Sequence, residues 1–368
     1  MSFLASITNN SSLQSNLKAT VTNTKRLSLQ KFMNSEPTAD LDAKLTDYFF
    51  EADVEKWYEK LKDCTFESDF VKILPKEANA IIANWKKITS EGNTEDDIQP
   101  TSEIPKELEP LVKRIDNSIA KHFNSKNVFI KLSSRSPKDS KTILKKATLE
   151  YHQILALKEN LNKYQTLNDK LCLFSKLMIT NSSVTSGKEA VTIMLDSWRV
   201  AEDLMSAYDV KTGKDLGYDV NIVVRGWNPK IEPKAEFRGF VIGKRLTCVG
   251  QYWHHLYFPE LENKKEQIAK DCLQFFNEKL KDSMPVPNAM LDLAWLGPGN
   301  IILIEVNPLA DGLGSFKAST GLFDYEEDVL QGKKPYEIRI CKEVAQKHEL
   351  RYVMNLEWRK ILLDKCDS

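Results

Sequence analysis

The sequence lacks several features that would place it in a specialised class of protein. Lysine plus arginine and aspartate plus glutamate both number 52, so the formal net charge is zero and a basic field for nucleic acid or a membrane surface is absent. No apolar run approaches the ~20 residues that a membrane span needs. The six cysteines include no C-x-x-C pair, which suits a reducing compartment. We expect a cytoplasmic monomer without a membrane segment or a strong nucleic-acid signature.

Acidic residues are missing from the start of the chain, where the first is Glu36. Residues 1–45 are instead rich in Ser, Thr and Asn, with a few basic residues. This composition is typical of a disordered polar tail. A mitochondrial transit peptide has a similar composition, so targeting to an organelle is the alternative.

The rest of the chain predicts a mixed architecture. The whole chain has 368 residues and is 42% hydrophobic, enough for a substantial core in two subdomains around a cleft. Predicted strands and helices alternate in mixed order without an internal repeat, which favours α+β layers with antiparallel sheets. We place an N-terminal subdomain at residues 46–225, a C-terminal subdomain at 226–345 and a helical tail at 346–368.

Local patterns predict individual elements. Residues 234–253 read as a hairpin that turns at Gly243-Lys244, and 288–296 and 300–308 as the last two strands. Residues 186–208 read as one long helix that begins at a capping box of Ser186 and Glu189. The acidic run at residues 90–103 reads as an exposed loop.

Polar side chains end the most apolar predicted strand. Glu305 directly follows Ile301–Ile304, and Asn307 faces the same side because side chains alternate along a strand. A buried carboxylate needs water, a cation or a metal. Asp292 lies on the preceding strand, which the turn "GPGN" joins to this one. Because Mg²⁺ prefers oxygen ligands, these three side chains predict a metal site; exposed polar strand ends are the alternative.

Basic side chains on two other strands suggest a phosphate site. Lys131 has apolar neighbours on its strand and can aim its ammonium across a cleft, or can pack its stem with the head in water. The following loop "SSRSPKDS" can wrap phosphates or be an ordinary turn. Arg238 offers a planar fork for phosphate oxygens, or forms a surface pair with Glu236.

An aromatic residue marks the end of a further strand. Trp227 follows "NIVVRG" and can stack on a purine while the strand's backbone reads the purine edge. Packing of Trp227 in the core explains this segment equally well.

At these residues the sequence resembles the cell division cycle protein 123 family, a divergent branch of the ATP-grasp fold. The shared landmarks are "VFIKLSSRSPKDS", "VVRGW", "AEFRGFV" and the acid-x-Asn-Pro end of the sheet, in the family's order from Val54 to Arg339. The resemblance implies an ATP-grasp-like α+β fold of two α+β subdomains with a nucleotide cleft between them, holding ATP and Mg²⁺. The chain departs from the family at Ser133-Ser134, where the family has Asn-Trp, and at Glu305, where it has Asp.

The resemblance also assigns roles to residues of this chain. It implies that nucleotide-binding residues are Lys131, Ser134, Ser136, Asp139, Val224, Arg225, Trp227, Arg238 and Asp292. Lys131 and Arg238 would bind phosphates, and Arg225 and Trp227 would lie at the adenine side. Asp292, Glu305 and Asn307 would hold magnesium.

The family's role, implied by the resemblance alone, is that of an assembly factor for eukaryotic translation initiation factor 2. It binds the gamma subunit and promotes joining of the alpha subunit. One alternative is an ATP-grasp ligase that joins a carboxylate to an amine, or RNA ends. The other is a nucleotide-dependent binding module with another partner. ATP binding is expected; turnover is left open.

Overall fold

The computed structural model describes residues 50–90, 103–124, 126–160, 162–208, 216–309, 321–324, 326–354 and 356–363. These residues fall in a single compact unit. The expected tail at residues 1–45 lies outside them, as does most of the expected acidic loop at 90–103. Among the described residues, no helix combines the length and the apolar character that crossing a membrane requires.

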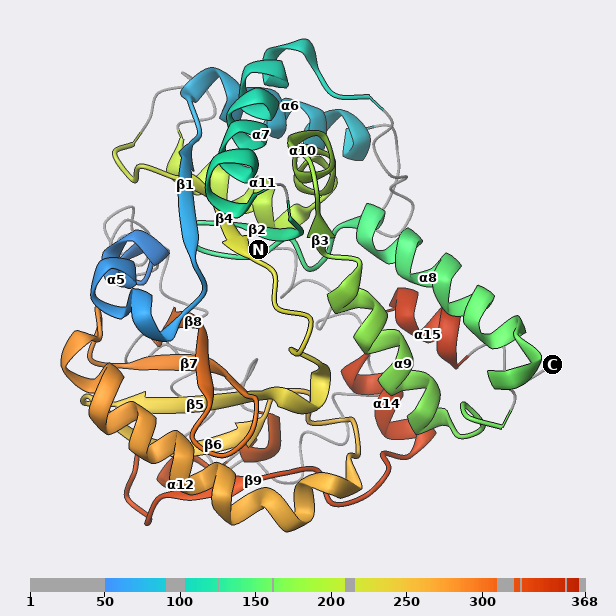
Figure 1. Cartoon of the computed structure of the whole chain (residues 1–368), viewed down its shortest axis with the longest axis vertical. Helices are drawn as coiled ribbons and strands as arrows, with labels where there is room; N and C mark the ends of the chain where they lie inside the picture. Colours follow the sequence, from blue (N-terminus) through green and yellow to red (C-terminus); the bar gives the residue numbers. More distant parts are fainter. Residues whose placement is uncertain are drawn as a thin grey trace, which may run out of the picture. The chain divides into compact units, whose positions relative to one another are not determined.

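A four-stranded antiparallel sheet forms one part of this unit (Figure 1). Its strand order is β1-β4-β2-β3. The strands are β1 (Ser68–Lys72), β2 (Val128–Leu132), β3 (Ser183–Val184) and β4 (Asn221–Gly226).

The two faces of this sheet have different neighbours because side chains alternate along each strand. Ile130 and Val224 face a core shared with four helices, whereas Lys131 and Arg225, one residue further along, take the opposite face. Figure 1 shows the four helices gathered together beside the sheet. They are α6 (Pro75–Ser90), α7 (Glu109–Phe123), α10 (Gly187–Leu195) and α11 (Trp198–Ala207).

A five-stranded sheet with the order β8-β7-β5-β6-β9 forms the second part. Its strands are β5 (Glu236–Ile242), β6 (Arg245–Gln251), β7 (Ala289–Trp295), β8 (Ile301–Pro308) and β9 (Glu337–Arg339). β9 pairs parallel with β6 and the other pairs are antiparallel. The helices α5 (Val54–Leu61) and α12 (Lys265–Phe275) contribute to the core on this sheet.

Two expectations about these strands have clear outcomes. The turn at Gly243-Lys244 is confirmed: both residues have positive φ, 58° and 57°, as a tight hairpin turn between β5 and β6 requires. The expectation that residues 300–308 are the last strand is wrong, because β9 follows. At three residues, β9 is too short to give a pattern.

The expected single helix at residues 186–208 is also wrong, because it is two helices, α10 and α11. Ser186 caps α10 as expected, with its Oγ accepting from Glu189 N at 3.2 Å. The expected capping box is confirmed only in this half, because the Glu189 carboxylate accepts from Thr185 N at 2.8 Å, one residue before Ser186. α10 ends at Leu195, and Ser197 starts α11 by accepting a hydrogen bond from Val200 N. A Ser side chain that accepts a hydrogen bond from a nearby backbone N–H competes with the backbone hydrogen bonds of a continuing helix.

A third group of helices packs beside the two sheets and shares its own core. It consists of α8 (Lys141–Ala156), α9 (Leu167–Thr180), α14 (Lys347–Val353) and α15 (Leu356–Leu362) (Figure 1). A short helix, α13 (Glu327–Leu330), lies near β6. The expected α+β class is confirmed, while the proposed subdomain boundaries stay a prediction.

Candidate functional site

Lys131 links the two sheets through a buried ion pair. Its side chain leaves β2 on the face opposite the helices and is 2% exposed. The ammonium lies 2.7 Å from Glu305 Oε1 on β8, and it donates a hydrogen bond to the carbonyl of Ser134 at 2.9 Å. The Lys131 ammonium therefore interacts with protein groups. The alternative considered from sequence, in which its ammonium lies in water, is wrong.

Three charged residues form a row across the second sheet. Arg238 on β5 lies opposite Asp292 on β7, which lies opposite Glu305 on β8. The guanidinium of Arg238 donates to both carboxylate oxygens of Asp292, at 2.8 and 2.9 Å. Arg238 therefore pairs with Asp292 and not with Glu236, the partner considered from sequence.

The structure brings together the three side chains expected to hold a metal. Asn307 Nδ2 lies 3.4 Å from Asp292 Oδ2 and 3.5 Å from Glu305 Oε2. Both carboxylates are buried, at 3% and 6% exposure. Within the described part of the chain, no group of three or more His, Cys, Asp or Glu side chains is placed to hold a metal ion, so two carboxylates and an amide are the donors this site offers.

Burial and neighbouring charges set the charge state of the two acids beside Lys131 and Lys138. Burial raises the pKa of Glu305, but the ammonium groups of Lys131 and Lys138 outweigh it and hold that pKa below its usual range. Burial raises the pKa of Glu236 to about 7, and the charge of Asp292 adds to the rise while Lys138 opposes it. Glu236 accepts a hydrogen bond from Trp253 Nε1 at 2.9 Å.

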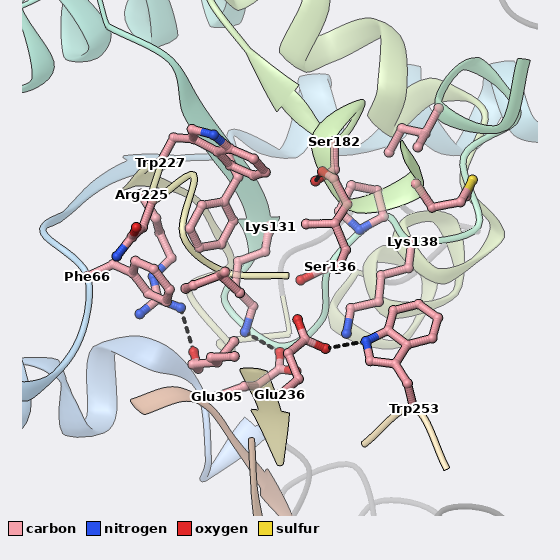
Figure 2. Close-up of a pocket in the computed structure, with 18 of the residues that line it drawn as sticks. Phe66, Lys131, Ser136, Lys138, Ser182, Arg225, Trp227, Glu236, Trp253 and Glu305 are labelled. Carbon is pink, nitrogen blue, oxygen red and sulfur yellow. Dashed lines mark hydrogen bonds and ion pairs between the residues drawn. The ribbon is translucent and has the colours of Figure 1, made fainter. Parts of the chain in front are cut away.

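Lys131, Lys138, Glu236 and Glu305 line a pocket with a cavity volume of about 250 Å³. The other predicted site residues of the second sheet, Arg238, Asp292 and Asn307, are not among its lining residues. Figure 2 shows Lys131, Glu305 and Glu236 at its centre, with Phe66, Arg225 and Trp227 on one side and Ser136, Lys138 and Trp253 on the other. Further apolar lining comes from Phe129, Ile143, Met178, Ile179, Ile231, Ile304 and Trp358. An apolar pocket with a few convergent charged groups is the usual form of a small-molecule site.

Arg225 lies on the pocket wall, but its side chain is bound to the protein. It is fully buried and donates hydrogen bonds to Ile304 O at 2.7 Å, Thr65 Oγ1 at 2.6 Å and Ser68 Oγ at 3.2 Å. Burial lowers its pKa to about 10. Arg225 thus ties β4 of the first sheet to β8 of the second.

Two neighbours of Arg225 have different positions. Val224 faces the helical core, fully buried, and its backbone lies in the sheet between β1 and β2. Trp227 lies just beyond the end of β4, lines the pocket and meets Phe129 edge-on at 6.5 Å. Arg225 and Trp227, the residues expected at the adenine side, both line the pocket, whereas Val224, also expected to bind nucleotide, is not among its lining residues.

The loop after β2 contributes only some of the side chains that its sequence offers. Ser136, Pro137 and Lys138 line the pocket, and Lys138 Nζ lies 3.1 Å from Tyr252 Oη. The Asp139 carboxylate instead accepts from Ser197 Oγ at 2.5 Å and from Arg199 N at 3.1 Å, so it holds the first turn of α11. The Ser134 hydroxyl donates to Asp203, also on α11.

Sequence reasoning missed several aromatic residues of the pocket, among them Trp253 and Trp358. Trp253 and Trp358 stack with ring centroids 6.2 Å apart and planes at 19°. The run "QYWHH" that follows β6 is an aromatic signal for Trp253, but Trp358 is more than 100 positions away and nothing local marks it.

Comparisons with known proteins identify the family and the fold of this chain. The D123 family model matches residues 175–360, half of the chain. The chain belongs to the D123 family. This match confirms the resemblance to the cell division cycle protein 123 family.

Curated relatives of this D123 family member match it over segments of different length. "Cell division cycle protein 123" of Aspergillus terreus is 32% identical over 33% of this chain and 28% of its own length. "Translation initiation factor eIF2 assembly protein" of Xenopus laevis is 30% identical over 33% and 34%. The chain thus matches about a third of the length of these two relatives. "Cell division cycle protein 123" of Candida glabrata is 23% identical over 78% of each chain.

Solved structures show the same fold. The structure of Cdc123 from Schizosaccharomyces pombe has a TM-score of 0.53 with this chain, at 18% sequence identity. The match covers 82% of this chain and 98% of the other. The mixed α+β fold with two sheets is therefore that of the Cdc123 structures.

Proposed function

We propose that this pocket binds ATP together with Mg²⁺, and that the protein acts in the assembly of eukaryotic translation initiation factor 2. The observation that carries the nucleotide proposal is the ion pair of Lys131 and Glu305 in the wall of an apolar pocket, with the pair of Arg238 and Asp292 next to Glu305 on the sheet. Cationic groups suit a triphosphate, and carboxylate oxygens suit the hard cation that accompanies it. The assembly role rests on the names of the relatives.

The residues present fit both groups. Asp292, Glu305 and Asn307 are the oxygen donors that would hold the metal, and Lys131, Lys138 and Arg238 are the cations for phosphate oxygens. The aromatic side chains at one side of the pocket, Phe66, Phe129 and Trp227, suit a purine. When bound, the ion would neutralise phosphate charge.

The charge pairs already present predict how the site binds. Both carboxylates are neutralised by cations of the protein, Asp292 by Arg238 and Glu305 by Lys131. A metal ion alone must compete with these cations, whereas a triphosphate gives Lys131 and Arg238 new partners. Metal and nucleotide are therefore expected to bind cooperatively, each tightening the other.

Calorimetric titration tests this site. Wild type should bind ATP with Mg²⁺, and Glu305→Ala should bind at least about tenfold more weakly, because one metal ligand is lost. Glu59→Ala, which removes an exposed carboxylate on α5, is the control and should bind like wild type. Unchanged affinity in Glu305→Ala, with its fold verified by circular dichroism, would refute the site.

For the assembly role, we propose that the protein binds the gamma subunit and promotes joining of the alpha subunit. Purified gamma subunit should bind the tagged protein, and alpha should join gamma faster in its presence. A ligand that binds only the folded state stabilises it by mass action, so ATP has a role here even without turnover. Absence of gamma binding with nucleotide present would reject this part while leaving the pocket assignment intact.

A ligase is the second candidate, and Glu236 is the observation that favours it. A pocket carboxyl with a pKa of about 7 can exchange a proton at neutral pH. Steady release of ADP or AMP in the presence of a carboxylate and an amine, and loss of that release in Glu236→Gln, would establish turnover.

A further inference from the structure

Trp358 makes the C-terminal helix α15 part of the pocket wall. Its indole lines the same cavity as Lys131 and Glu305, although α15 is separated from them by at least 50 residues of sequence. The ring stacks on Trp253 and meets Phe174 of α9 edge-on, with centroids 4.9 Å apart and planes at 88°. The wall at this point therefore exists only when α15 is docked.

The docked position of α15 depends on tertiary contacts. The helix has seven residues, too few to be stable alone in water. Leu362 and Leu363 are buried in the core that α8, α9 and α14 share. A partly buried ion pair joins Glu357 to Lys141 at the start of α8. These contacts give the helix a docked state that can be weakened without touching the pocket.

A direct chain of contacts joins α15 to the charged centre of the pocket. Trp358 stacks on Trp253, and Trp253 donates its indole N–H to Glu236. Trp253 thus fixes the orientation of a pocket carboxylate on one side and supports the C-terminal helix on the other. Loss of α15 would remove one face of the stack and open the cavity to water.

We propose that docking of α15 and occupation of the pocket by nucleotide are thermodynamically coupled through Trp358. A ligand that contacts this wall binds the docked state better than the undocked state and shifts the equilibrium towards docking. By reciprocity, weaker docking lowers the affinity for the ligand by the same factor. The inference rests on the proposed nucleotide function and adds a regulatory role for the C-terminal helix.

Affinity for ATP with Mg²⁺ provides the first test. Trp358→Ala should bind about three- to tenfold more weakly than wild type, the range set by one aromatic contact. Trp358→Phe keeps an aromatic face and should recover part of the loss. Trp85→Phe, in a separate aromatic cluster with Trp198, is the control and should leave affinity unchanged.

A charge swap tests coupling without altering the pocket wall. Lys141→Glu reverses one partner of the ion pair with Glu357, and should weaken both docking and nucleotide binding. The double variant Lys141→Glu/Glu357→Lys restores the pair with opposite polarity and should return affinity towards wild type. Such a rescue depends on docking, because neither residue lines the pocket.

Hydrogen exchange reports docking directly. In wild type, ATP with Mg²⁺ should slow amide exchange in peptides that cover residues 347–363, and this protection should shrink in Trp358→Ala. If wild type binds nucleotide but these peptides exchange at the same rate with and without it, and Trp358→Ala binds normally, the coupling is refuted and the nucleotide site stands. If wild type binds no nucleotide, the proposed function and the coupling both fail.

Discussion

Two acidic regions lie near Lys131, and they differ in charge state. On β8, Glu305 pairs with the ammonium at 2.7 Å, and its pKa is held low. Before α5, Asp53 is 3% exposed, and its Oδ1 has no hydrogen-bond partner among the residues that the structure describes. Burial and the charge of Glu55 raise the pKa of Asp53 to about 8, and Lys131 only partly opposes this.

The difference shows how one buried cation selects which carboxyl is ionised. Desolvation disfavours the charged form of both acids, and only the direct partner of Lys131 overcomes it. The ionised carboxylate is consequently the one that borders the pocket, where a metal ion would need it. Asp53, which does not line the pocket, is held in its neutral form near neutral pH.

The largest effect should come from removing Lys131, the cation that interacts with both Glu305 and Asp53. Lys131→Met leaves Glu305 buried without a partner, so the free energy of unfolding should fall by about 3–5 kcal/mol, measured by urea denaturation. Lys131→Met/Glu305→Met replaces both charges with apolar groups and should regain most of that loss. Equal losses in the single and double variants would show that the two residues are not energetically coupled.

A smaller effect should appear in the pH dependence of stability. The pKa of Asp53 rises on folding from an ordinary value of 3.8 to about 8, so between these values the folded state binds more protons than the unfolded state. Stability should therefore fall as pH rises, by at most about 2.5 kcal/mol from pH 5.5 to 7.5.

Asp53→Asn removes this titration and should flatten the profile in the same denaturation experiment. Glu305, whose pKa is lowered on folding, has the opposite sign: its stabilisation is present above its ordinary pKa of 4.5 and is lost as pH falls below it. An unaltered slope in Asp53→Asn would assign the pH dependence to other groups, such as Glu236.

The smallest effect should come from the contact that holds Glu55 near Asp53. Ser133 Oγ donates to Glu55 Oε1 at 2.5 Å and accepts from Asn221 N at 2.9 Å. Ser133→Ala should lower the free energy of unfolding by about 1 kcal/mol. Ser206→Ala, on the exposed side of α11, is the control with little expected change. If Ser133→Ala lowers the free energy of unfolding no more than Ser206→Ala does, the hydrogen bond from Ser133 to Glu55 does not stabilise the fold.

The local sequence pattern correctly predicted the orientation of the charged residues Lys131, Asp292 and Glu305 on their strands. Strand alternation in "VFIKL" predicted that Lys131 faces away from its apolar neighbours, and the run before Glu305 predicted a carboxylate that needs a cation. The short turn "GPGN" between two apolar strands was enough to predict that Asp292 would meet Glu305. Alternation and hairpin pairing are set by neighbouring residues, so they are visible in sequence.

The sequence by itself thus determined the longer strands, their outward-facing charged residues and the family, but not the three-residue strand β9. Tertiary structure alone decided the partners of those residues: that Lys131 pairs with Glu305 rather than Asp53, that Asp139 caps α11 instead of facing the pocket, and that Trp358 completes the pocket wall. The reason is that burial and pairing energies depend on which distant groups share a desolvated space. Residues 131 and 305, or 253 and 358, acquire a common environment only when the chain has folded.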